Sequence, residues 1–188
     1  MPNTDSTKTN TVGWNDINWR QVERYVFKLQ KRIYSASRRG DVKQVRKLQK
    51  TLYRSWSNKV LAVRRVTQDN RGHKTAGVDG VKSLSPEERM NLVGQLKIEG
   101  KSQPTRRVWI PKPGKDESRP IGIPTMYDRA LQEVLKNALE PEWEAQFEPN
   151  SYGFRPGRSC QDAIWQIKNS ILNKPKFVLD ADIAKCFD

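Results

Sequence analysis

Apolar residues recur every three or four positions in two long stretches near the start of the chain. The first stripe runs over residues 19–33 and the second over 42–63. This spacing is typical of amphipathic helices that bury one face. Gly40 supplies a helix stop and Asp41 an N-cap between the stripes, so the sequence predicts two helices that pack antiparallel across a tight turn.

The hydrophobic period changes in the middle of the chain. Ser85 and Glu88 form a capping-box pattern that starts a helix ending near Gly100. Residues 106–111 and 118–123 then have the composition of two short strands, and the turn-rich segment between them predicts a β-hairpin.

The second half is predicted to be mixed. Helices are expected over 128–139, 141–147 and 161–172, the first of them capped by the aspartate that begins it. A loop rich in glycine and arginine lies at 150–159, and the apolar run at 176–183 predicts a strand. The fold class is therefore α+β with a large helical front.

Basic charge is concentrated in this front. The net charge is +14, and residues 1–75 hold 18 of the 35 Lys/Arg but only 5 of the 21 Asp/Glu. A local excess of this kind is the expected footprint for a polyanion such as RNA. The alternatives are a merely solvated basic surface and an acidic lipid surface, for which the front lacks a large Phe/Leu-rich face. The cations expected to form this polyanion-binding surface are Arg24, Lys28, Lys31, Lys43, Arg46, Lys47, Lys50 and Arg54.

Cysteine and histidine chemistry is poorly represented. Cys160 and Cys186 lack metal-ligand spacing, and His73 is the single histidine, so neither a zinc site nor a Cys-His nucleophile is predicted. No apolar run reaches membrane-span length and no signal peptide follows Met1, so we expect no membrane partner. A reducing, intracellular and cytoplasmic setting is the expectation.

One carboxylate stands out near the last residue. Asp182 ends the apolar run at 176–183, and carboxylate oxygens suit Mg²⁺. Phosphoryl transfer with two ions needs at least one further carboxylate. On spacing alone, a structural role for such an aspartate is the more frequent one.

Four segments resemble, in family order, the blocks of reverse transcriptases of the group II intron maturase type. They are Thr-Ala-Gly-Val-Asp-Gly at 75–80, the hairpin at 106–124, Ser-Tyr-Gly-Phe-Arg-Pro-Gly-Arg-Ser at 151–159, and an Asp with an aromatic five residues later at 182–188. The resemblance covers roughly residues 70–188. The helical front resembles the family's N-terminal extension more loosely.

This resemblance implies a truncated right-hand polymerase. Residues 1–18 are expected to be disordered or frayed, and 19–74 to form the basic helical extension. Residues 75–174 would then form the fingers, and 175–188 the first strand of the palm with the first catalytic block.

The resemblance also assigns roles at the end of the chain. Asp182 matches the catalytic, metal-binding aspartate, with the Ile183 carbonyl as a backbone ligand of Mg²⁺. Phe187 matches the aromatic residue beneath the nucleotide sugar, which would clash with a 2′-hydroxyl and favour dNTPs.

In the hairpin, Lys112 and Arg119 match the cations that hold the incoming triphosphate. A Lys point charge and an Arg fork suit that ligand. Arg106 is expected to assist at the nucleotide, and Ile123 resembles the apolar residue that packs on the templating base. The alternative for both triphosphate cations is a charged hairpin edge that guards against aggregation.

Two further segments keep two interpretations each. Arg155 and Arg158 are expected at the template or primer backbone, or else are simply solvated in a Gly/Pro loop. The block at 75–80 is either a linker between front and fingers or a loop near the template.

The function implied is an RNA-directed DNA polymerase acting with structured intron RNA, an RNA template with a DNA primer, and dNTPs. No Asp-Asp pair occurs in the chain, whereas the family's second catalytic block is a Tyr/Phe-x-Asp-Asp turn. The 188-residue chain is therefore predicted to be inactive alone. The alternatives are a stand-alone RNA-binding module without polymerase activity and, less favoured, an unrelated basic structural protein.

Overall fold

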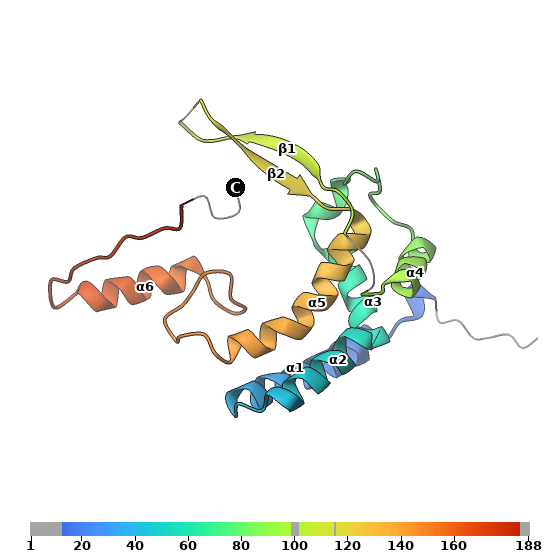
Figure 1. The fold of residues 1–188 in the computed structure, drawn as a ribbon, viewed down its shortest axis with the longest axis horizontal. Helices are drawn as coiled ribbons and strands as arrows, with labels where there is room; N and C mark the ends of the chain where they lie inside the picture. The colour runs from blue at the N-terminus through green and yellow to red at the C-terminus, as the bar shows by residue number, and fades with distance from the viewer. Residues whose placement is uncertain (1–12, 99–101, 115, 185–188) are drawn as a thin grey trace, which may run out of the picture.

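The computed structural model describes residues 13–98, 102–114 and 116–184, and Figure 1 shows the course of the chain. It is a mixed structure of helices with one small antiparallel sheet. None of the helices it describes is both long and apolar enough to cross a membrane. The elements, in order, are η1 (Trp14–Asp16), α1 (Trp19–Arg38), α2 (Val42–Arg54), α3 (Trp56–Arg64), η2 (Arg65–Asp69), η3 (Arg71–Lys74), α4 (Pro86–Gln95), β1 (Arg106–Pro111), β2 (Ser118–Ile123), α5 (Met126–Glu144) and α6 (Cys160–Ile171).

The predicted turn between the first two helices is present. Gly40 has a φ of +71°, a conformation that favours glycine, and the Asp41 carboxylate accepts a 2.9 Å hydrogen bond from the Gln44 N–H. The second stripe forms two helices rather than one. Ser55 is extended and its Oγ accepts from the Asn58 N–H at 3.2 Å, so it ends α2 and caps α3.

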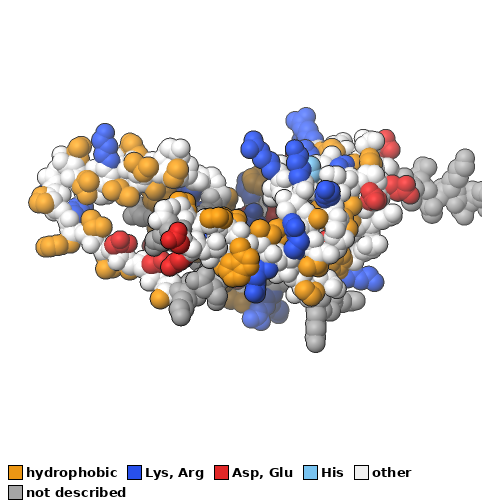
Figure 2. All heavy atoms as spheres, turned by 90° about the horizontal axis from the view of Figure 1, so that it is seen from above, with side chains coloured by type: hydrophobic (Ala, Val, Ile, Leu, Met, Phe, Trp, Pro, Cys, Tyr) orange, Lys and Arg blue, Asp and Glu red, His pale blue; other side chains and the backbone are white. Residues whose placement is uncertain are grey.

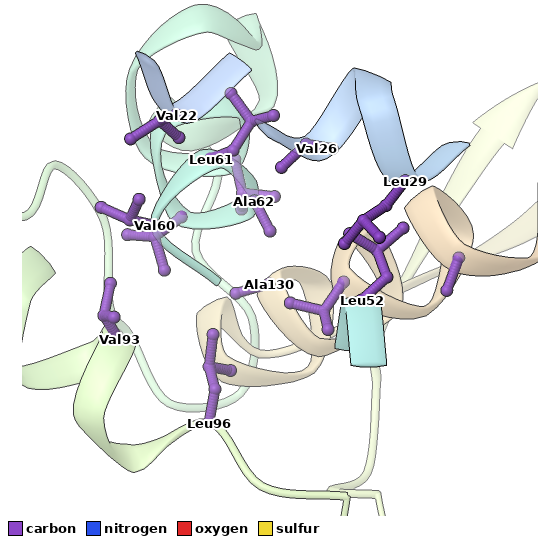
Figure 3. Packing of buried hydrophobic residues seen from close by; sticks show 14 of the residues in the cluster. Val22, Val26, Leu29, Leu52, Val60, Leu61, Ala62, Val93, Leu96 and Ala130 are labelled. Atoms are coloured by element: carbon purple, nitrogen blue, oxygen red, sulfur yellow. The ribbon is translucent and has the colours of Figure 1, made fainter. Parts of the chain in front are cut away.

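The core lies among the helices of the front and α5. Val22, Val26, Leu29 and Ile33 of α1 are all buried, as the three-and-four spacing predicted. Figure 3 shows side chains of α1, α2, α3 and α5 meeting in this cluster. The ordered front begins earlier than expected, because Trp14, within the segment 13–18 predicted to be frayed, is buried against this core. Residues 1–12 lie outside the described part of the chain.

Helix α4 starts with the predicted capping box. The Ser85 Oγ accepts from the Glu88 N–H at 3.3 Å, and the Glu88 carboxylate accepts from the Ser85 N–H at 2.7 Å. These hydrogen bonds, first the one from the Ser85 backbone, lower the pKa of Glu88. The helix ends at Gln95, somewhat earlier than predicted.

Helix α5 differs from the prediction at both ends. Thr125, not Asp128, is the N-cap: its Oγ1 accepts from the Asp128 N–H at 3.1 Å. The helix also continues through Pro141 instead of breaking into two pieces. Proline lacks an N–H, which leaves the Asn137 carbonyl without its helical donor, and the Gln30 Nε2 donates to that carbonyl at 3.0 Å. The side chain of α1 therefore compensates the proline and lets α5 run on.

The part after α5 is built differently. Helix α6 forms within one residue of its predicted bounds but buries none of its side chains. The predicted strand at 176–183 is wrong: no residue described after α6 forms a strand, and Phe177, Val178 and Leu179 are almost fully exposed. A strand needs a neighbour for its backbone N–H and C=O groups. Figure 1 shows that the chain reverses direction after α6 and that this segment runs back along the helix without a neighbouring strand.

Candidate nucleotide and RNA interface

The β-hairpin presents two chemically different faces. In its register Arg106 lies opposite Ile123, and Ile110 lies opposite Arg119. Opposed residues of an antiparallel pair project to the same face, and the face alternates along each strand. One face therefore carries both arginines with apolar side chains between them. The other face carries Arg107 and the exposed Trp109.

Lys112 lies at the turn, directly after β1. Its backbone N–H donates to the Glu117 carbonyl at 2.8 Å, and its Nζ lies 2.9 Å from a Glu117 carboxylate oxygen. The side-chain hydrogen bond from Lys112, followed by its charge, lowers the pKa of Glu117. Both side chains are largely solvent-accessible, so the pair can open toward a stronger anion.

The 75–80 block is attached to the base of the hairpin. A Cβ on Gly77 would lie 2.6 Å from the Pro124 carbonyl oxygen, so only glycine allows this approach. The Asp79 carboxylate accepts from the Met126 N–H, a free donor at the start of α5, at 3.1 Å. The block is thus docked where β2 passes into α5.

Arg129 completes this attachment. Its guanidinium donates to the carbonyls of Pro124, Gly72 and Thr75 at 3.0, 2.8 and 2.6 Å. One side chain therefore joins η3 and the start of the block to the residue that follows β2. The block is packed against the base of the hairpin, and both interpretations from sequence, a linker and a loop near the template, stay predictions.

The Gly/Arg loop holds Arg155 inward. Its guanidinium forms a bidentate pair with Glu144 at 2.9 and 2.7 Å and donates to the carbonyls of Glu148 and Ser151. The hydrogen bond from Arg155 lowers the pKa of Glu144, and the same bond raises the pKa of Arg155. This buried fork gives Arg155 an internal structural role, and its contact with the template or primer backbone stays a prediction.

Arg158 and Phe154 are the outward-facing groups of the same loop. Arg158 is exposed, with its guanidinium 5.3 Å from the Tyr152 ring centre. Phe154 has a φ of +57° and is fully exposed. The internal anchoring of Arg155 therefore leaves one cation and one aromatic ring of this loop for external contacts.

Asp182, the candidate metal ligand, is exposed near the end of the described chain, and its Oδ1 accepts from the Ile183 N–H at 2.8 Å. Phe187 lies outside the described residues. Nowhere in the described ranges do three or more His, Cys, Asp or Glu side chains gather as a metal site would require. Within these ranges, Asp182 is therefore not part of such a cluster.

The cations predicted on the front helices are all exposed. They follow the outer faces of α1 and α2, whose inner faces form the core. On the side that Figure 2 shows, Lys and Arg gather over the half built by the front and the hairpin, while the end formed by α6 is mainly apolar. The exposed cations are Arg24, Lys28, Lys31, Lys43, Arg46, Lys47, Lys50 and Arg54.

Sequence reasoning missed two residues that shape this region, Asp79 and Arg129. Asp79 belongs to the quoted 75–80 block but received no role of its own. Its position after Gly77, in a block with two glycines, is the one signal that could have marked a side chain binding nearby backbone. Arg129 carries no such signal, because two of its three acceptors, the Gly72 and Thr75 carbonyls, are more than fifty residues away in the sequence.

Two family comparisons divide the chain at the hairpin. Residues 14–96 match the N-terminal domain of reverse transcriptase, and residues 110–188 match the reverse transcriptase (RNA-dependent DNA polymerase) domain. Together they define the class of protein as a reverse transcriptase.

Named relatives specify the class further. The group II intron-encoded protein LtrA of Lactococcus lactis subsp. cremoris is 39% identical over 63% of this chain and 20% of its own length. Maturase-like protein 1 of Euglena gracilis is 35% identical over 90% of this chain and 38% of its own. Protein YkfC of Escherichia coli (strain K12) is 37% identical over 66% of this chain and 35% of its own.

The chain belongs to the reverse transcriptases of the group II intron maturase family. It spans between a fifth and two fifths of the length of these relatives.

Proposed function

We propose that this chain supplies the RNA-binding front and the nucleotide-binding fingers of an RNA-directed DNA polymerase. Its partners would be structured intron RNA, an RNA template with a DNA primer, and dNTPs. The observation that carries the proposal is the hairpin register, which gives Arg106, Arg119 and Ile123 one common face.

That face suits an incoming nucleotide. The Arg119 fork can bind phosphate oxygens in pairs, and Lys112 adds a point charge at the turn. Ile123 offers an apolar surface for the templating base, beside the Arg106 guanidinium on the opposite strand. The triphosphate must compete with Glu117 for Lys112, because that carboxylate is held ionised by the pair.

The metal-binding part of the proposal rests on Asp182 and the Ile183 carbonyl, with Phe187 as the residue that excludes a 2′-hydroxyl. A carboxylate and a backbone carbonyl are oxygen ligands of the type that holds Mg²⁺, and the ion would supply charge stabilisation in phosphoryl transfer. A two-ion site needs more than one carboxylate, and the described residues hold no cluster of three or more His, Cys, Asp or Glu side chains. The Asp-Asp pair of the family's second catalytic block is also absent from the sequence. We therefore propose that this chain alone does not polymerise.

Primer extension with matched hairpin variants tests the nucleotide site. The chain would be combined with a polypeptide carrying the Asp-Asp turn and the rest of the palm from a related enzyme. Arg119→Gln should raise the KM for dNTP roughly ten-fold or more, because a charged hydrogen bond to the triphosphate is removed. Arg107→Gln, on the opposite face, is the control and should leave it unchanged. Equal effects of both variants would reject the assignment of that face.

A stand-alone RNA-binding module is the second candidate. The exposed cations of α1 and α2 lie on helices that share a core, so RNA binding needs nothing from the hairpin. Salt-sensitive RNA binding, combined with no extension under any complementation, would favour this module over the polymerase.

A further inference from the structure

A hollow of about 480 Å³ lies between α1, α5 and the Gly/Arg loop. Its walls include Phe27 and Tyr34 from α1, Pro141 from α5 and Pro156 from the loop. Phe27 is 61% exposed and Tyr34 is 38% exposed. Two aromatic rings therefore face solvent at the edge of an apolar hollow. Their exposed surface does not contribute to the buried core.

Hydrogen bonds between α1 and α5 fix the spacing of two walls of the hollow. Gln30 of α1 donates to the Asn137 carbonyl of α5 at 3.0 Å, and the Ser37 Oγ donates to the Glu142 carbonyl at 3.0 Å. These contacts lie on both sides of the Tyr34 ring along α1. A hollow whose walls are already fixed loses little conformational freedom when it takes a ligand.

The third wall is fixed by the fork described above. Glu144, which lines the hollow, is bound by the Arg155 guanidinium, and Pro156 follows directly after that arginine. The ion pair also neutralises the Glu144 carboxylate. The Glu140 carboxylate lies 3.9 Å from the Lys136 Nζ, so neither acid stands there as an isolated charge.

Lys31 lines the hollow, and further cations of α1 lie beside it. The Lys31 Nζ lies 5.6 Å from the centre of the Phe27 ring. At about 100° per residue, Arg24, Lys28 and Lys31 follow one exposed stripe of α1, and Phe27 and Tyr34 follow its edge toward α5. An aromatic slot beside a row of cations is suited to a nucleotide whose base stacks and whose phosphate is bound.

We infer that this hollow binds an unpaired nucleobase of an RNA whose phosphates lie on the α1 cations. The base stacks on Phe27 and Tyr34, and Lys31 contacts the adjoining phosphate. The inference rests on the proposed RNA-binding function and adds selectivity for looped-out bases over fully paired RNA. Phosphate contacts alone would not distinguish the two.

The inference is tested by removing the aromatic rings that line the hollow, with a control substitution on the opposite edge of α1. Phe27→Leu and Tyr34→Leu keep apolar bulk and helix propensity but remove the stacking surface. Tyr25→Leu is the control, because Tyr25 is 43% exposed on the same helix and does not line the hollow. The probes are an RNA stem–loop with one 2-aminopurine in its loop and a blunt RNA duplex of equal length.

Phe27→Leu and Tyr34→Leu should each bind the stem–loop at least about five-fold more weakly than the wild type does. Duplex affinity and the salt slope should stay as in the wild type, and Tyr25→Leu should match the wild type throughout. The wild type should quench 2-aminopurine emission on binding, and both slot variants should lose this quenching.

Two outcomes overturn the inference, and they differ in what else they affect. If the wild type binds both RNAs, and Phe27→Leu and Tyr34→Leu bind the stem–loop as tightly as the wild type, the nucleobase site is wrong while RNA binding by the front stands. The hollow would then be suited to an apolar polypeptide segment. If the wild type binds neither RNA at low salt, the proposed RNA-binding function fails together with the site.

Discussion

Helices α1 and α6 carry the same kind of amphipathic pattern and reach opposite outcomes. The apolar stripe of α1 is buried against α2, α3 and α5, whereas Ile164, Ile167 and Ile171 of α6 remain exposed. Periodicity identifies the apolar face of a helix but not the surface that covers it. The front therefore buries its apolar residues in a core that it shares with α4 and α5. The region after α5 leaves its apolar side chains exposed.

The largest expected effect of this difference is on stability. Leu52→Ala, at a fully buried position of α2, should lower the free energy of unfolding by about 2–5 kcal/mol. Ile167→Ala on α6 should change it by no more than about 0.5 kcal/mol. Urea denaturation measures both. Similar losses would show that α6 is covered in solution and would end the contrast.

A smaller effect is expected at the polar link between α3 of the front and α5. The Asn137 Nδ2 donates to the Asn58 Oδ1 at 2.8 Å, and the Asn58 Nδ2 donates to the Val134 carbonyl at 3.0 Å, all buried. Asn58→Ala leaves these groups unpaired and should cost about 1–3 kcal/mol by urea denaturation. Asn91→Ala, at an exposed position of α4, is the control and should be close to neutral.

RNA binding should divide along the same boundary. Replacing Lys43, Lys47 and Lys50 by Gln should reduce the slope of log K against log salt by about one for each phosphate that these side chains neutralise. Filter binding across a salt series measures this slope. The matched change of Lys168, Lys174 and Lys176, in and after α6, should leave it unaltered. Equal reductions would mean that total charge, not the front surface, governs binding.

The smallest effect concerns pH at the Gly/Arg loop. Arg155 lowers the pKa of Glu144, so the folded loop favours the carboxylate. The stabilisation is present above the ordinary carboxyl pKa and is lost as pH falls through the lowered one. Glu144→Gln should therefore melt below wild type at pH 7 and converge with it in acid. Glu148→Gln should follow wild type at every pH, because Arg155 binds the backbone carbonyl of Glu148, which this change keeps.

The sequence predicted what local rules govern. The stripes of α1 and α2, the Gly40 turn, the Ser85 capping box and the two strands of the hairpin need only nearby residues. The strand at 176–183 was wrong because strand formation needs a neighbour, which no sequence pattern supplies. α5 runs through Pro141 because Gln30, more than a hundred residues away, provides the missing donor.

Candidate chemistry follows the same division. The sequence assigned Arg106 and Arg119 to the two strands of the hairpin, and the register seen in the structure puts them on one face. The inward fork of Arg155 could not be predicted, because an arginine in a Gly/Pro loop has the same sequence signal whether it meets Glu144 or solvent. The hydrogen bonds that Arg129 donates could not be predicted either, because they depend on carbonyls from two separate segments.

The polymerase assignment is tested most directly at Asp182. Extension of a DNA primer on an RNA template should be absent with this chain alone. It should appear, dependent on Mg²⁺, when a polypeptide with the Asp-Asp turn is added, and Asp182→Asn should abolish it while RNA binding persists. Extension that survives Asp182→Asn, or that the chain performs alone, would contradict the assignment.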